Sequence, residues 1–124
     1  MSTVLERIES HRSQVHTRSG PASYIDTGGP SRPALFAHGV ITSSYLWRHV
    51  IDHLDGQRRC VAVELPLYGP TPAAADQDFS LPGLARVVAD FSDALDLADI
   101  YLVATDTGGA IAQVFATGNP EWPT

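Results

Sequence analysis

The feature that most constrains the fold is an alternation of short apolar runs with segments of helical periodicity. Each helical segment follows an apolar run, in one case after a proline- and alanine-rich surface loop expected at 66–77, and each apolar run has the length of a buried strand. Such alternation predicts a parallel sheet whose strands are joined by right-handed helical crossovers. The expected fold class is α/β, a mostly parallel sheet flanked by helices. The expected strands are 34–39, 59–65 and 99–105, and the expected helices are 43–56, the stretch after Ser80 and the stretch after Asp106.

The N-terminal part predicts a short helix followed by two strands. Thr3 and Glu6 have capping-box spacing, which favours a helix over residues 3–10. Two short strands are expected at 13–18 and 22–29, around a Gly20-Pro21 turn. We treat 1–124 as one partial core domain, with residues 1–12 as an N-terminal extension and 13–124 as strands one to five with three helices.

Two further structural expectations concern exposed and buried faces. In the helix at 43–56, one apolar face is expected to be formed by Leu46, Trp47, Val50 and Leu54. The strand at 99–105 would be an unprotected sheet edge, which favours self-association through strand addition.

Composition excludes several classes of partner. The net charge is −6, and the basic residues near Arg12 and Arg58 are too sparse to form a patch, so neither nucleic acid nor an anionic membrane is an expected partner. A single cysteine, Cys60, rules out an internal disulfide framework and fits a reducing compartment. No run approaches the roughly 20 apolar residues of a membrane span, and the N-terminus does not read as an export signal, so we expect a cytoplasmic protein.

The segment that carries chemistry is Ala104-Thr105-Asp106-Thr107-Gly108-Gly109. Small residues around a central aspartate, between a strand and a helix, are the pattern of a nucleophile elbow with aspartate in place of serine. Such a turn raises the central side chain above the sheet, and the following helix stabilises its charge. The alternative is an ordinary helix N-cap, and the local pattern alone does not choose between the two.

A second motif, His38-Gly39, ends an earlier buried strand. Because parallel strands share one carboxyl-terminal edge, this loop and the elbow are expected to face the same crevice. The backbone N–H groups of Val40 and Thr107 could then converge on one oxygen as an oxyanion hole. The side chain of His38 needs no catalytic role in this hypothesis and is equally explained as a satisfied histidine at a turn.

These residues carry a family resemblance. The segments "HGVITSSYLWRHVI", "VAVELPLYGPT", "FSLPGLARVVADFSDAL" and "LVATDTGGAIAQVFATGNPE" resemble the N-terminal half of an α/β-hydrolase. Within that superfamily they are most similar to the haloalkane dehalogenase and epoxide hydrolase branch. The resemblance implies that Asp106 is the nucleophile and that the amides of Val40 and Thr107 form the oxyanion hole. It also implies an ester between Asp106 and a carbon electrophile, hydrolysed by a histidine-activated water.

The chain departs from that family pattern in two ways. Dehalogenases typically have asparagine and tryptophan at the positions of Val40 and Thr107, where their side chains hold the departing halide. All five histidines precede Asp106, whereas the catalytic histidine, its acid partner and the cap of the family come later. We therefore expect the 124-residue chain alone not to turn over a small-molecule substrate. A catalytically inactive remnant or interaction module is the alternative, and neither a cofactor nor a metal is expected.

Other candidate residues have simpler explanations. Glu64 is interpreted as a carboxylate that accepts hydrogen bonds from loop amides. His49 and His53 have the spacing of a zinc pair without a third ligand, which favours an exposed helix face. Cys60 is expected to be a small buried hydrophobe and Trp47 a packing residue. Capping is the expected role of Ser43 or Ser44.

Overall fold

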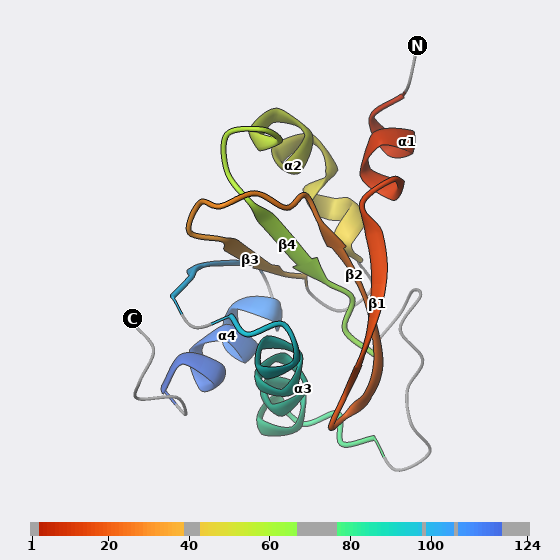
Figure 1. Ribbon diagram of the computed structural model, residues 1–124. Helices are drawn as coiled ribbons and strands as arrows, with labels where there is room; N and C mark the ends of the chain where they lie inside the picture. Colours follow the sequence, from red (N-terminus) through yellow and green to blue (C-terminus); the bar gives the residue numbers. More distant parts are fainter. Residues whose placement is uncertain (1–2, 39–42, 67–76, 98, 106, 118–124) are drawn as a thin grey trace.

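A five-stranded mixed sheet forms the centre of the computed structural model, which describes residues 3–38, 43–66, 77–97, 99–105 and 107–117 (Figure 1). The strand order is β1-β2-β4-β3-β5. The hairpin β1–β2 is antiparallel and joins β4 in antiparallel pairing, whereas β4, β3 and β5 run parallel to one another. The predicted α/β class is confirmed. The strands are β1 (Arg12–Thr17), β2 (Gly20–Asp26), β3 (Ala34–Ala37), β4 (Cys60–Val63) and β5 (Tyr101–Ala104).

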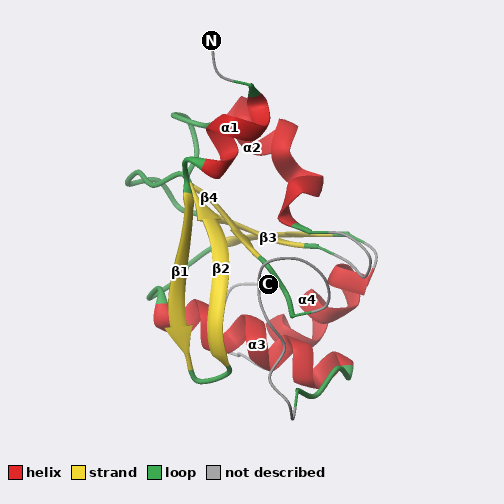
Figure 2. Ribbon diagram, turned by 90° about the vertical axis from the view of Figure 1, so that its right-hand side faces the viewer, coloured by secondary structure: helices red, strands yellow, loops and turns green. Residues whose placement is uncertain are grey.

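Helices cover both faces of the sheet, as Figure 2 shows. They are α1 (Val4–Glu9), a 3₁₀ turn η1 (Ser44–Trp47) that continues into α2 (Arg48–Leu54), α3 (Leu81–Ala94) and α4 (Thr107–Thr117). Successive residues of a strand point to opposite faces, so Leu35 packs with the α3 and α4 side while Phe36 packs with the α1 and α2 side. The short strands β3 and β4 are therefore buried on both faces, which explains their uninterrupted apolar sequences.

Local capping signals predicted the helix starts correctly. Thr3 accepts a hydrogen bond from the Glu6 N–H at 3.1 Å, and Ser80 accepts one from the Gly83 N–H at 3.2 Å. Gly56, just beyond α2, has φ +85°, a conformation that glycine adopts without strain. These interactions lie within one turn of chain, so the sequence pattern is sufficient to specify them.

Two local predictions are wrong. The β1–β2 turn is formed by Arg18 and Ser19 rather than Gly20-Pro21, because Pro21 is already paired with His16 in the hairpin. Pro21 is tolerated there since it lies in the outer hairpin of the sheet. The Thr17 hydroxyl stabilises the actual turn by donating to the Gly20 carbonyl at 2.7 Å.

The predicted apolar face of the helix at 43–56 is wrong for two of its four residues. Leu46 and Val50 are exposed by 44% and 46%, whereas Ile51 is fully buried. The segment begins as a 3₁₀ turn, which has fewer residues per turn than an α-helix, so the apolar stripe is displaced along the chain. Trp47, Ile51 and Leu54 belong to the apolar cluster on this side.

The strand β5 lies at the edge of the sheet, as predicted. It pairs with β3 on one side, and no strand of the described residues pairs with its other side. Tyr101 at its start is 46% exposed. None of the helices in the described residues is both long enough and apolar enough for a membrane span.

Candidate active site

The candidate site lies at the carboxyl-terminal edge of the parallel strands. Ala37 is in register with Val63 of β4 and with Ala104 of β5. The residues that follow these strand ends, His38, Glu64 and Thr105, therefore emerge side by side. This edge brings together the two motifs that the sequence predicted would face one crevice. Of the predicted site residues, Gly39, Val40 and Asp106 lie outside the described residues, whereas His38, Thr107, Gly108 and Gly109 lie within them.

The start of α4 lies close to the end of the neighbouring strand β3. The helix α4 begins at Thr107, and the Gly109 N–H donates to the Thr105 carbonyl at 3.3 Å, which closes the turn. A Cβ atom on Gly108 would lie 2.6 Å from the His38 carbonyl oxygen and 2.7 Å from that of Ala37. No real Cβ sits so close to backbone oxygens, so this position requires glycine.

Gly109 differs from Gly108. A Cβ on Gly109 would meet nothing within 4 Å, so the close approach of strand and helix does not require a small residue there. Of the two small residues that follow Thr107 in the predicted elbow pattern, only Gly108 is therefore required by the available space.

His38 uses its ring to hold the end of β4. The ring is completely buried, and its Nε2 accepts a hydrogen bond from the Leu65 N–H at 2.8 Å. An Nε2 that accepts a hydrogen bond carries no proton, so the ring is neutral with its proton on Nδ1. Glu64 Oε2 lies 3.8 Å from the same nitrogen, but this contact is not an ion pair because the ring is uncharged. His38 is thus the satisfied turn histidine that the sequence allowed.

Glu64 is a fully buried carboxylate at the end of β4. Its Oε1 accepts a hydrogen bond from the Ser44 N–H at 3.0 Å and another from the Ser44 hydroxyl. This agrees with the interpretation of Glu64 as an acceptor for loop amides. The carboxylate therefore ties the start of η1 to the end of β4.

Arg12 approaches Glu64 from β1. Its Nη2 lies 3.6 Å from Glu64 Oε1, and its Nη1 donates to the Ser23 hydroxyl at 2.8 Å. Its Nε donates to the two carboxylate oxygens of Glu9, the last residue of α1, at 3.0 and 2.9 Å. In the sequence, Arg12 is one of several scattered basic residues. Its partner Glu9 is local, but Ser23 and Glu64 lie far along the chain, so no sequence pattern marks the contact with Glu64.

Three other candidates do not form a second site. Trp47 packs against Phe36 with ring centroids 5.2 Å apart, which fits the packing role. His49 and His53 are exposed on α2, and the described part of the chain contains no group of three or more metal-ligating side chains. Burial raises the pKa of the Cys60 thiol to about 11, so this cysteine is not a thiolate nucleophile at neutral pH.

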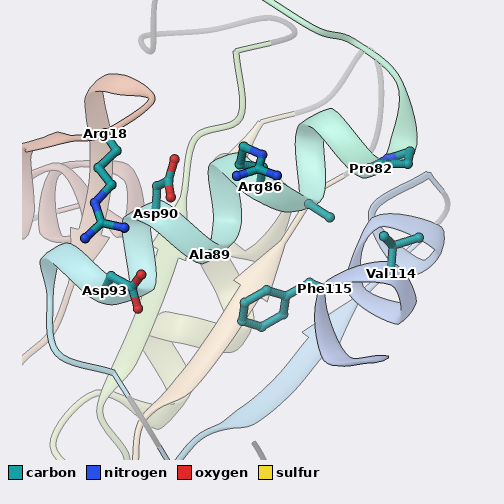
Figure 3. A pocket seen from close by; sticks show the side chains of 9 residues that line it. Arg18, Pro82, Arg86, Ala89, Asp90, Asp93, Val114 and Phe115 are labelled. Atoms are coloured by element: carbon teal, nitrogen blue, oxygen red, sulfur yellow. The ribbon is translucent and has the colours of Figure 1, made fainter. Parts of the chain in front are cut away.

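A polar hollow of about 330 Å³ between α3 and α4 is also unsuited to catalysis (Figure 3). In Figure 3 the Arg18 side chain points toward Asp90 and Asp93, while Phe115 and Val114 of α4 form the opposite wall. Asp90 accepts a hydrogen bond from the Ser19 hydroxyl at 2.5 Å. Arg18 and Arg86 offset the charges of Asp90 and Asp93, and the described residues that line the hollow include no histidine to serve as a general base.

The fold and the edge described above define a class of protein. The strand order with an antiparallel first hairpin, and the close approach of α4 to the end of β3 at Gly108, fit the framework of an α/β-hydrolase core. The chain belongs to the α/β-hydrolase fold family, whose sequence pattern matches residues 33–121.

Similar proteins narrow the comparison within that family. A haloalkane dehalogenase of Mesorhizobium japonicum is 37% identical over 110 residues, covering 89% of this chain and 35% of that protein. Epoxide hydrolase 4 of Mus musculus is 33% identical over 100 residues, covering 79% of this chain and 28% of that protein. The crystal structure of the haloalkane dehalogenase DatA from Agrobacterium tumefaciens superposes with a TM-score of 0.79 at 34% identity, covering 89% of this chain and 37% of that one. The chain thus spans about a third of the length of these relatives.

Proposed function

We propose that this chain is the nucleophile-bearing part of a hydrolase that uses an aspartate, Asp106, to attack a carbon electrophile such as an epoxide or an alkyl halide. The observation that carries the proposal is the close approach of Gly108 to the His38 carbonyl, which places the start of α4 against the end of β3. The similarity to haloalkane dehalogenases and an epoxide hydrolase supports the same chemistry.

The first chemical step is a displacement at carbon. One oxygen of the Asp106 carboxylate attacks the substrate carbon and forms a C–O ester bond, while the bond from that carbon to the leaving oxygen or halogen breaks. The leaving atom departs with the electron pair. It is released as a halide or, from an epoxide, takes a proton from water and becomes a hydroxyl. Thr107 begins α4, so the helix dipole favours the ionised carboxylate needed for this attack.

The second step is hydrolysis of the ester. A water molecule, deprotonated by a general base, attacks the ester carbonyl carbon, and the resulting oxyanion is stabilised by the amides of Val40 and Thr107. The oxyanion then collapses and breaks the bond between the carbonyl carbon and the ester oxygen. The alcohol product leaves with the proton held by the base, and the Asp106 carboxylate is restored. In the family this base is a histidine, but all five histidines here precede Asp106, and His38 already accepts the Leu65 N–H. We therefore expect the 124-residue chain on its own to form the ester without turning it over.

Incubation with substrates of three chemical classes tests this proposal. The protein would be incubated with a terminal epoxide, a 1-haloalkane and a p-nitrophenyl ester, each beside an Asp106→Asn variant of nearly the same shape. We expect consumption of the epoxide or haloalkane, stoichiometric or catalytic, that the Asp106→Asn substitution abolishes. Equal behaviour of the parent and Asp106→Asn with every substrate would refute the role of Asp106.

A second candidate function is that of an interaction module, favoured by the open edge of β5. The edge adjoins a groove of about 620 Å³ between β5 and α4, lined by Tyr101, Leu102 and the small residues Ala112 and Ala116. Unpaired backbone groups beside an apolar groove favour strand addition by a second copy. Sedimentation velocity should then show dimers that Tyr101→Glu disrupts, whereas Phe79→Glu, at another exposed aromatic residue, should not. A monomer at all concentrations would contradict this candidate.

A further inference from the structure

The buried carboxylate of Glu64 is only partly satisfied by the described residues. Glu64 and Arg12 form an ion pair at 3.6 Å, too long for a hydrogen bond. Glu64 Oε2 and Arg12 Nη2 have no hydrogen-bond partner among the described residues, although both atoms are buried. A buried pair with unsatisfied atoms is often less stable than apolar residues of similar volume. The described contacts of the pair are therefore not those of an arrangement built for stability alone, and the pair lies at the edge that carries the candidate site.

The contacts of Glu64 indicate what the charge holds. Glu64 receives two hydrogen bonds from Ser44, one from its backbone N–H and one from its hydroxyl. The next residue, Leu65, donates to the ring of His38. Residues at the end of β4 thus form hydrogen bonds with both ends of the connection from His38 to Ser44. Val40, whose amide we propose for the oxyanion hole, belongs to this connection.

We propose that Glu64, balanced by Arg12, is a positioning residue that fixes the connection between His38 and Ser44 and thereby aims the Val40 amide. This inference rests on the proposed function. Glu64 does not touch the reacting atoms in this account but acts through Ser44. A charged acceptor makes shorter and stronger hydrogen bonds than a neutral one, so a carboxylate holds Ser44 more firmly than an amide or hydroxyl could.

Two double variants separate positioning from charge compensation. Arg12→Met/Glu64→Met and Arg12→Met/Glu64→Gln both remove the buried charges and have similar volumes. Only the second retains an oxygen that can accept from Ser44. Because both lack an unpaired charge, we expect similar unfolding midpoints in urea. Asp26→Asn is the control, since Asp26 pairs with Arg59 at the other end of β4.

The kinetic measurement is single-turnover ester formation with the substrate that the parent protein consumes. We expect the rate at saturation to fall about 10- to 100-fold in Arg12→Met/Glu64→Met relative to Arg12→Met/Glu64→Gln, with less than about a twofold change in the half-saturating concentration. Asp26→Asn should behave like the parent. Equal saturating rates in the two double variants, in a protein whose parent is active, would overturn the inference.

A second measurement does not depend on activity. Amide ¹H–¹⁵N spectra should show the Val40 and Ser44 signals displaced, and their hydrogen exchange faster, in Arg12→Met/Glu64→Met but not in Arg12→Met/Glu64→Gln. If no variant and no parent forms an ester, the proposed function fails while these spectra still decide the positioning role. Unchanged Val40 and Ser44 signals in the Met variant would overturn it. Should that variant not fold, Ser44→Ala removes the hydroxyl contact alone and must displace the Val40 signal for the inference to stand.

Discussion

The two ends of β4 each carry an arginine–carboxylate pair, and the pairs differ in how well they are made. At the start of the strand, Arg59 Nε and Nη2 donate to the two oxygens of Asp26 at 3.0 and 2.8 Å. Asp26 also accepts from the Gly28 N–H at 2.9 Å. At the end of the strand, Arg12 and Glu64 approach only to 3.6 Å, and each leaves a buried atom without a hydrogen bond within the described structure.

The difference is consistent with one pair that stabilises the fold and another that, in our proposal, positions the candidate site. Burial alone would raise the pKa of Asp26, but the hydrogen bonds from Arg59 and Gly28 and the charge of Arg59 outweigh it, so the pKa is lowered. The ionised form of Asp26 is therefore more stable, relative to the protonated form, in the folded protein than in water. Glu64 is less well satisfied and lies at the functional edge of the sheet. Locally unfavourable arrangements in proteins are concentrated at such edges.

Removing the arginine of each pair should have the largest effect and should differ between the two ends. Arg12→Met leaves the carboxylate of Glu64 buried without its counter-charge, and we expect a loss of about 3–5 kcal/mol in the free energy of unfolding. Arg59→Met leaves Asp26 at a partly exposed position where water can replace the guanidinium, with an expected loss of about 1 kcal/mol. Urea unfolding of both variants measures the difference. Equal losses would show that the two ends are energetically equivalent.

The elbow offers a second test, because its geometry depends on packing and not on charge. Gly108→Ala places a Cβ against the carbonyls of Ala37 and His38 and should cost about 1–3 kcal/mol, with loss of ester formation. Gly109→Ala adds a Cβ in open space within α4 and should stabilise the protein by about 0.5–1 kcal/mol. Thermal unfolding of the two variants should therefore shift in opposite directions. A shift of the same sign in both would contradict the close approach at Gly108.

Acid titration gives a smaller effect that isolates the well-made pair. Because the pKa of Asp26 is lower in the folded protein than its ordinary 3.8, its stabilisation is fully present above that value and is lost as the pH falls through the folded pKa. The stability difference between the parent and Asp26→Asn should be constant near neutrality and should shrink below pH 3.8. Urea midpoints at a series of pH values measure this. A difference that grows on acidification would reverse the assigned sign.

Much of the fold could be predicted because its determinants are local. Thr3 and Ser80 cap helices within one turn of chain, and short apolar runs between helices specify buried parallel strands. The exposure of Leu46 and Val50 could not be predicted in this way. It depends on a 3₁₀ start to the helix, which apolar periodicity alone does not reveal.

In the candidate site, too, local features could be predicted from the sequence and contacts between distant segments could not. The requirement for glycine at position 108 follows from the elbow pattern, and the buried His38 follows from its place after an apolar strand. The contact of Arg12 with Glu64 joins β1 to the end of β4, and that of Glu64 with Ser44 spans 20 residues. Such contacts depend on the order of the strands in the sheet, so they could not be predicted from local sequence patterns.

The central claim is that Asp106 forms a covalent ester, and one measurement tests it directly. The protein would be incubated with the terminal epoxide and the 1-haloalkane, quenched in acid and examined by intact-mass and peptide mass spectrometry. We expect one added substrate-derived group on the peptide that contains Asp106, absent from Asp106→Asn and retained in Asp99→Asn, which changes an exposed carboxylate just before β5. An unmodified protein with both reagents, or an adduct that persists in Asp106→Asn, would contradict the account.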